Sequence, residues 1–149
     1  MNARLTIFAV VDAAPIVQLF SRVFNTPDDH MLIATTLTEG LSLAAALAPD
    51  LAFIDVSLGA NAGLALVHHL RAVAPNAVVY ALAGESSLHI GAQAIVLGGA
   101  SLIVMPPSEH ELLSAASSVR ARLVEEAEKQ MPELQAELVA GSPTRNWRR

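Results

Sequence analysis

The sequence predicts an α/β fold, in which a doubly wound parallel sheet of five strands carries helices on both faces and ends in an extended C-terminal helix. Three observations predict it. Five short apolar runs alternate with five segments of helical periodicity, at short spacing. The runs are continuously apolar, which is typical of strands buried on both faces. The chain has 149 residues, 53% of them hydrophobic, enough for one domain with a sizeable core.

The five apolar runs are rich in Val, Ile, Leu, Phe and Ala. The first, "RLTIFAVVD", is the clearest, because it has no polar position between Ile7 and Val11. Strands are expected at residues 4–12, 30–36, 50–55, 77–83 and 101–105.

The segments between these runs have helical spacing and recognisable ends. Pro49 and Pro75 stop two of them, and a Gly-Gly pair stops a third. The last segment opens on a Ser-x-x-Glu cap at Ser108. Pro132 is expected to break or kink it near Met131. Helices are expected at residues 14–24, 39–48, 62–74, 86–99 and 108–130.

Strands that alternate with helices form a parallel sheet, and the economical arrangement is the flavodoxin-like strand order 2-1-3-4-5. Ligand sites in such sheets lie at the carboxyl ends of strands 1 and 3, where the strand order reverses. Asp12 ends the first expected strand and Asp55 the third. The sequence therefore predicts an acidic pocket at that edge.

The composition excludes several classes of function. The net charge is −5, which is no footprint of nucleic-acid binding. No apolar stretch approaches the roughly 18–20 residues that cross a membrane, and the N-terminus does not resemble a signal peptide. Cysteine is absent, which fits a reducing compartment. A cytoplasmic protein is expected, and the scarcity of lysine beside abundant Ala and Arg suggests a bacterial source.

Three segments resemble the receiver domain of bacterial two-component response regulators. They are "FAVVDAAP" (8–15), "APDLAFIDVSLGANAG" (48–63) and "LGGASLIVMPPSEHELL" (97–113). The second matches the family pattern at Pro49, Asp50, Asp55, Val56, Leu58 and Gly63. The resemblance covers about residues 4–125, so we expect a receiver-like domain at 1–125. A C-terminal helical extension with a flexible tail is expected at 126–149.

The resemblance implies a phosphoryl-accepting site with five kinds of group. Asp55 matches the phosphoacceptor, and Asp12 matches the first of two acids that hold Mg²⁺. The family also has a Thr or Ser at the end of strand 4, a lysine at the end of strand 5, and an aromatic switch residue in strand 5.

This chain departs from that pattern at all the remaining positions of the site. Ala13 stands in place of the second acid and Leu82 in place of the hydroxyl residue. Met105 replaces the lysine and Leu102 the aromatic residue. The only lysine of the chain, Lys129, lies too far along the sequence for any alignment to place it there.

We therefore expect a degenerate receiver that is no enzyme and acts by protein–protein contact, with Asp55 vestigial and mostly structural. Catalytic and metal-binding residues are not expected, nor a cofactor, with Mg²⁺ binding weak or absent. One alternative is a working receiver phosphorylated on Asp55. A less favoured one is a small flavodoxin-like enzyme or FMN binder, since no phosphate-binding loop follows the first strand.

Partners are expected to be proteins: a histidine kinase or a downstream signalling protein, and a second copy of the chain. Neither nucleic acid nor membrane is expected. The homodimer is predicted to use the face of the fourth helix, fifth strand and fifth helix, because this face often carries the family's contacts. The last helix has an apolar stripe that is expected to be buried between the copies: Ala116, Val119, Leu123 and Ala127.

Overall fold

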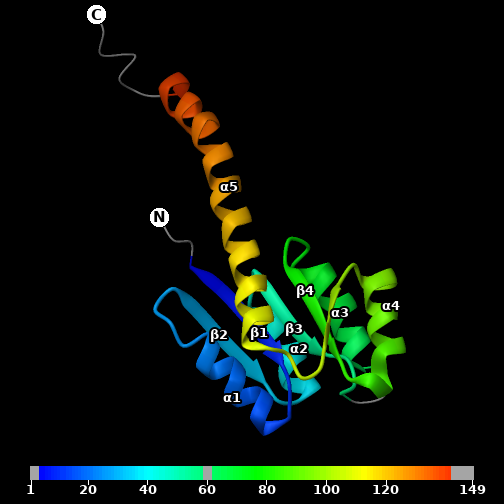
Figure 1. Cartoon of the computed structure of the whole chain (residues 1–149). Helices are drawn as coiled ribbons and strands as arrows, with labels where there is room; N and C mark the ends of the chain where they lie inside the picture. The colour runs from blue at the N-terminus through cyan, green and yellow to red at the C-terminus, as the bar shows by residue number, and fades with distance from the viewer. Residues whose placement is uncertain (1–3, 59–61, 142–149) are drawn as a thin grey trace, which may run out of the picture.

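The computed structural model describes the backbone of residues 4–58 and 62–141, and the side chains of residues 4–58 and 62–130. Five strands form one parallel sheet in the order β2-β1-β3-β4-β5, which confirms the predicted topology (Figure 1). The strands are β1 (Leu5–Val10), β2 (Asp29–Ala34), β3 (Leu51–Asp55), β4 (Val78–Ala83) and β5 (Ser101–Val104).

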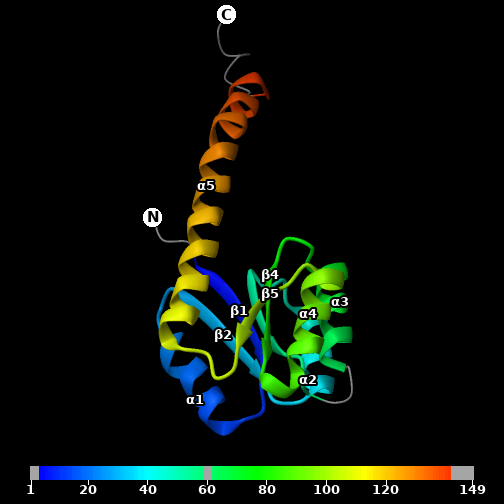
Figure 2. The same ribbon diagram turned by 45° about the vertical axis from the view of Figure 1, so that its right-hand side comes forward.

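Helices cover both faces of this sheet, as Figures 1 and 2 show: α1 and α5 on one face, and α2, α3 and α4 on the other. They are α1 (Ala14–Val23), α2 (Leu37–Ala46), α3 (Ala62–Val73), α4 (Leu88–Gly98) and α5 (Glu109–Gly141), with a 3-10 turn η1 (Glu85–Ser87) before α4. The expected helix 86–99 therefore starts later than predicted. The Ser87 hydroxyl closes η1 by accepting the Gly84 N–H at 3.0 Å.

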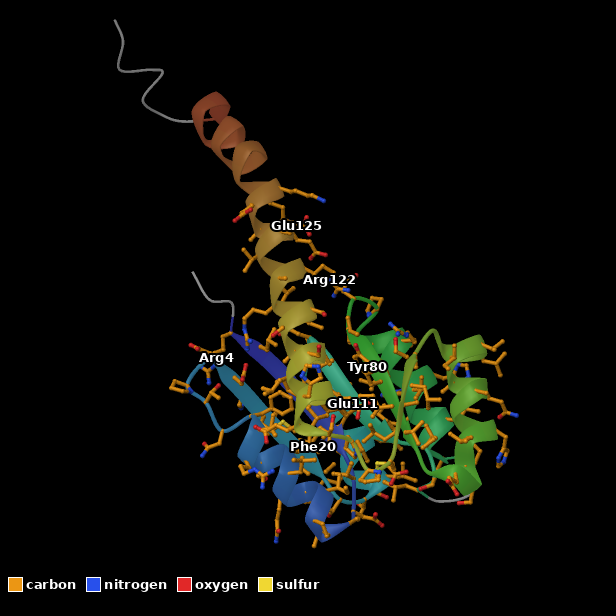
Figure 3. All side chains as sticks on the ribbon, viewed as in Figure 1. Arg4, Phe20, Tyr80, Glu111, Arg122 and Glu125 are labelled. Atoms are coloured by element: carbon orange, nitrogen blue, oxygen red, sulfur yellow. The ribbon has the colours of Figure 1, made fainter. Side chains whose placement is uncertain are left out.

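Two apolar cores lie on the two faces of the sheet. Under α1 and α5, the rings of Phe20 and Phe53 meet edge to face at 5.0 Å, and Phe53 stacks on Tyr80 at 5.5 Å. Figure 3 shows Phe20 and Tyr80 turned into this layer. Under α2, α3 and α4, small alanines alternate with Phe8, Ile54 and leucines. Because both sheet faces are covered, the strands are continuously apolar. This is why the strands could be recognised in the sequence.

Both expected helix signals around β5 are confirmed. Gly99 ends α4 with a left-handed φ of 64°, a conformation that glycine adopts without cost. At the start of α5, Ser108 Oγ accepts the Glu111 N–H at 3.1 Å, and Glu111 Oε1 accepts the Ser108 N–H at 3.0 Å. This reciprocal pair is the capping box that the sequence predicts.

An arginine joins α3, α4 and the loop before β4. The Arg71 guanidinium donates from Nε to the Gly98 carbonyl at 2.7 Å, from Nη2 to Gly99 at 2.8 Å, and from Nη1 to Ala77 at 2.8 Å. Two of these carbonyls belong to the end of α4, where helical carbonyls have no partner in their own helix. Arg71 therefore ties α3 to the end of α4 and to the loop before β4, and we call these three hydrogen bonds the Arg71 clasp.

The break expected at Pro132 is wrong. The α5 helix runs on for 33 residues to Gly141, through Pro132 and through the expected domain boundary at 125 (Figure 1). Proline there removes the hydrogen bond to the Glu128 carbonyl and costs about 3 kcal/mol. The turn around Glu128 is exposed, so water can satisfy the freed carbonyl. Residues 142–149 of the expected tail lie outside the described part of the chain.

The expected inter-chain role of the α5 stripe is also wrong for its first half. Ala116 and Val119 are buried against the sheet of their own chain, and Leu123 packs on the same core. Arg120 pairs with Asp29 of β2, and Arg122 Nη2 donates to the Asn76 carbonyl at 3.0 Å, beside the loop before β4 in Figure 3. The first four turns of α5 are thus part of the domain.

Candidate functional site

Asp55 is the last residue of β3 and only 6% exposed. Its Oδ1 accepts two hydrogen bonds from Ser57, one from the backbone N–H at 2.9 Å and one from the hydroxyl at 2.6 Å. Its carbonyl accepts the Leu58 N–H at 3.3 Å. The carboxylate thereby holds the turn that leaves β3, as an aspartate does in an Asx-turn.

The strand positions next to Asp55 are apolar. Asp55 pairs with Leu82 of β4, and Leu82 pairs with Ile103 of β5. Paired residues of parallel strands point to the same face of the sheet, so these three side chains form one row. Leu82 is fully buried and Ile103 nearly so, in the core under α1 and α5, and Met105 packs against the same core. Apolar side chains, Leu82 and Met105, therefore stand at the two positions to which the resemblance assigns a hydroxyl and an ammonium group.

The segment after β1, on the other side of Asp55, has few polar groups that could bind a metal ion. Asp12 lies past the end of β1 and is exposed, and Ala13, the N-cap residue of α1, has no side-chain hydrogen-bonding group. Within the described residues, no three His, Cys, Asp or Glu side chains gather to hold a metal ion. The side chains present do not fit the Mg²⁺ site that the family implies, which wants several oxygen ligands.

Leu102, at the aromatic switch position, faces the opposite core. A Cβ atom added to Gly91 of α4 would lie only 2.7 Å from Leu102 Cδ1. Gly91 thus lets α4 approach closely enough for Leu102 to fill the space beneath it. This position holds a packed aliphatic side chain.

Close packing explains why position 63 of the matched motif is a glycine. A Cβ atom there would lie 2.6 Å from the Val56 Cα and 2.9 Å from the Asp55 carbonyl oxygen. The start of α3 therefore presses directly on the turn after Asp55, and only glycine leaves room for it.

Sequence reasoning missed two polar groups, Ser57 beside Asp55 and Arg71 at the opposite edge of the sheet. A serine two residues after an aspartate is a recognisable turn signal, so the role of Ser57 was within reach. The Arg71 clasp had no local signal, because its partners at the end of α4 lie 27 and 28 residues away.

Removing the Asp55 side chain should destabilise this protein. We expect Asp55→Ala to lower the free energy of unfolding by about 1–2 kcal/mol, because both Ser57 donors lose their acceptor. Asp55→Asn keeps an oxygen at Oδ1 and should cost less than half as much. Urea unfolding measures both. A stabilising effect of either substitution would mean that repulsion between acidic groups, and not the Ser57 turn, dominates at Asp55.

A second feature, the surface of α4 and β5, carries exposed apolar side chains. Val96 is 79% and Leu97 62% exposed. The whole stretch from residue 86 to 108 contains no Asp, Glu, Lys or Arg. Figure 2 shows α4 beside β5, an edge strand of the sheet. The patch has five large exposed or half-exposed members: Leu88, Ile95, Val96, Leu97 and Val104.

Several solved structures share this fold. The chain is similar to the receiver domain of AraT, a response regulator from Geobacillus stearothermophilus, with 22% identity, a TM-score of 0.72, and 83% of this chain and 98% of that chain covered. It is also similar to the signal receiver domain of an HD domain-containing protein from Pseudomonas fluorescens, with 23% identity, a TM-score of 0.74, and coverage of 86% and 95%. NtrX from Brucella abortus matches at 21% identity and a TM-score of 0.69, over 88% of this chain and 29% of NtrX.

The fold, with its lone aspartate at the end of β3, defines a receiver-type signalling module. Residues 7–117 match the response regulator receiver domain family, and the chain belongs to this family. Among curated proteins none matches significantly. Across the described helices, none is both long and apolar enough to cross a membrane.

Proposed function

We propose that this receiver is a degenerate form, which signals in the cytoplasm by protein–protein contact, has no enzymatic activity and is not phosphorylated on Asp55. The observation that carries the proposal is the buried row beside Asp55, in which Leu82 occupies the hydroxyl position. The partner would be a histidine kinase or a downstream signalling protein.

The electrostatics of phosphoryl transfer support this proposal. A phosphoryl group on Asp55 would carry about two negative charges, in place of the single charge of the carboxylate. Catalysis of the transfer depends on positioning and on groups that neutralise this charge, with little help from covalent chemistry. Here the corresponding positions are Ala13, Leu82 and Met105, none of which carries a charge or a hydroxyl. The Ser57 hydroxyl, the polar group closest to the carboxylate, already donates to Oδ1.

The same reasoning predicts that Mg²⁺ stabilises the protein very little. A ligand raises stability only as far as its concentration exceeds its dissociation constant, and two acids make a weak site. We expect 10 mM Mg²⁺ to shift the melting temperature by less than about 1 °C. Differential scanning calorimetry measures the shift. A rise of several degrees that disappears in Asp12→Ala would reveal a metal site and count against the proposal.

We also propose that the chain is a constitutive homodimer through the face of α4, β5 and α5. A group of exposed apolar side chains on neighbouring elements is typical of an interaction site. A patch without charges is compatible with its own copy across a two-fold axis, where each residue set meets the same set on the partner. Because the proposed site has no phosphate switch, the dimer needs no covalent trigger.

A single charge at the centre of the patch should dissociate this dimer. Val96 is the most exposed large apolar residue of α4, so we expect Val96→Glu to raise the dimer dissociation constant by at least about 100-fold, since it buries a charge without a partner. Sedimentation velocity at micromolar concentration measures the mass. Ser42→Glu, an exposed position on α2, is the matched control and should leave the dimer intact. A monomeric wild-type protein, or a Val96→Glu dimer of unchanged affinity, would defeat this part of the proposal.

A further inference from the structure

The second half of α5 leaves the body of the domain. Leu123 still packs on the core, but residues 125–130 are all exposed, and Figures 1 and 2 show the helix projecting from the sheet up to Gly141. Glu125 lies on this projecting part in Figure 3. The residues from Val124 to Gly141 form a rod about 27 Å long, which we call the stalk. A single helix of this length is marginally stable in water, which raises the question of what it packs against.

The sequence of the stalk has the spacing of a two-stranded coiled coil. Apolar residues recur at alternating steps of three and four: Val124, Ala127, Met131, Leu134 and Leu138. This is the a/d spacing of a heptad repeat, and one further large apolar residue of the stalk, Val139, lies at an outer b position. In this register Val124, Met131 and Leu138 are a positions, and Pro132 falls at an outer b position. A narrow seam fits another helix with the same seam.

The charges of the stalk permit a parallel pair. In a parallel coiled coil, a g residue of one helix faces the e residue of the next heptad on the other. Here Gln130 would face Gln135 of the second copy, a pair without charge. Glu125 and Glu126 fall at outer heptad positions and are exposed.

We propose that the stalks of two copies pair in parallel and in register along this seam. The inference rests on the proposed homodimer, because the stalk alone is small. A strip about 27 Å long and about 10 Å wide covers roughly 270 Å² on each chain, about a third of the roughly 800 Å² per partner in a standard stable interface. The stalk therefore adds to a contact between the receiver bodies, and it transmits their pairing to whatever binds or follows the far end of α5.

The absence of cysteine from the chain allows a direct test by cross-linking. In a parallel pair in register, residue 138 of one copy meets residue 138 of the other, at a Cα separation that a disulfide can span. We expect Leu138→Cys to form a covalent dimer under mild oxidation at least about ten times faster than Ala136→Cys, its control at an outer f position. Equal rates for the two variants would overturn the proposal, as would an antiparallel pair, which separates the two residues 138.

A second measurement separates the stalk from the α4 patch. We expect Leu134→Glu to raise the dissociation constant of the full-length dimer about ten-fold or more, and Ala136→Glu to leave it unchanged. If Val96→Glu dissociates the dimer while Leu138→Cys cross-links no faster than its control, the patch stands and the stalk pairing is wrong. If Leu138→Cys cross-links rapidly and Val96→Glu has no effect, the stalk pairing stands and the proposed patch is wrong.

Discussion

Arg71→Met should lower the free energy of unfolding by about 3 kcal/mol. The guanidinium donates to three carbonyls on two segments, at 2.7–2.8 Å, and hydrogen bonds from a charged donor contribute about 1.5–3 kcal/mol each before solvent exposure reduces them. Methionine keeps an apolar stem of similar length, so packing changes little. For a chain of this size the loss corresponds to a melting temperature lower by about 6–12 °C. Thermal and urea unfolding measure it.

Two variants control this measurement. Arg71→Lys keeps the charge but has one donor group, which cannot reach all three carbonyls, so it should recover less than half of the loss. Arg22→Met removes an arginine whose side chain is 70% exposed and whose only described ion pair is a 3.8 Å contact with Glu109. It should change stability by less than about 0.5 kcal/mol. If Arg71→Met were no more damaging than Arg22→Met, the clasp would not hold α4 in place.

Restoring the missing groups should restore phosphoryl acceptance. The triple variant Ala13→Asp, Leu82→Thr and Met105→Lys introduces an acid, a hydroxyl and an ammonium group. Each is placed at the position where the resemblance assigns it. We expect a phosphoryl adduct on Asp55 with a small phosphodonor and Mg²⁺, formed at least about 100-fold faster than in the wild-type protein, because electrostatic stabilisation supplies most of the catalysis. Intact-mass spectrometry over time measures the uptake.

The cost in stability has to be checked in the same variant. Leu82 is fully buried, and Leu82→Thr removes apolar volume from the core, at about 2–3 kcal/mol. Circular dichroism confirms that the variant is folded, and adding Asp55→Asn to it should abolish the adduct. A folded triple variant that acquires no phosphoryl group would show that the three replacements do not account for the lost chemistry.

Much of the fold could be predicted from the sequence because the sheet is buried on both faces. Its strands are continuous apolar runs, and Pro and Gly mark the helix ends next to them. The site could be placed for the same reason: Asp55 ends the β3 run, and the strand register then puts Leu82 beside it. The capping box at Ser108 is local, so four residues of sequence were enough to predict it.

The remaining features depend on contacts that no local pattern encodes. The side of α5 that carries Ala116 and Val119 is apolar, but the pattern alone does not say whether its own sheet or a second copy covers it. The break expected near Pro132 had a local reason, the missing N–H, which the α5 helix tolerates at that point. Arg71 acts on carbonyls at the end of another helix, so only the packing of α3 against α4 reveals its role.

The most direct test of the central claim is the mass of the wild-type protein after incubation with a small phosphodonor and Mg²⁺, beside the triple variant as a positive control. The proposed function predicts that wild-type protein keeps its unmodified mass while the triple variant gains one phosphoryl group. A phosphoryl adduct on the wild-type protein that disappears in Asp55→Asn would contradict it, and would make this chain a working phosphoacceptor.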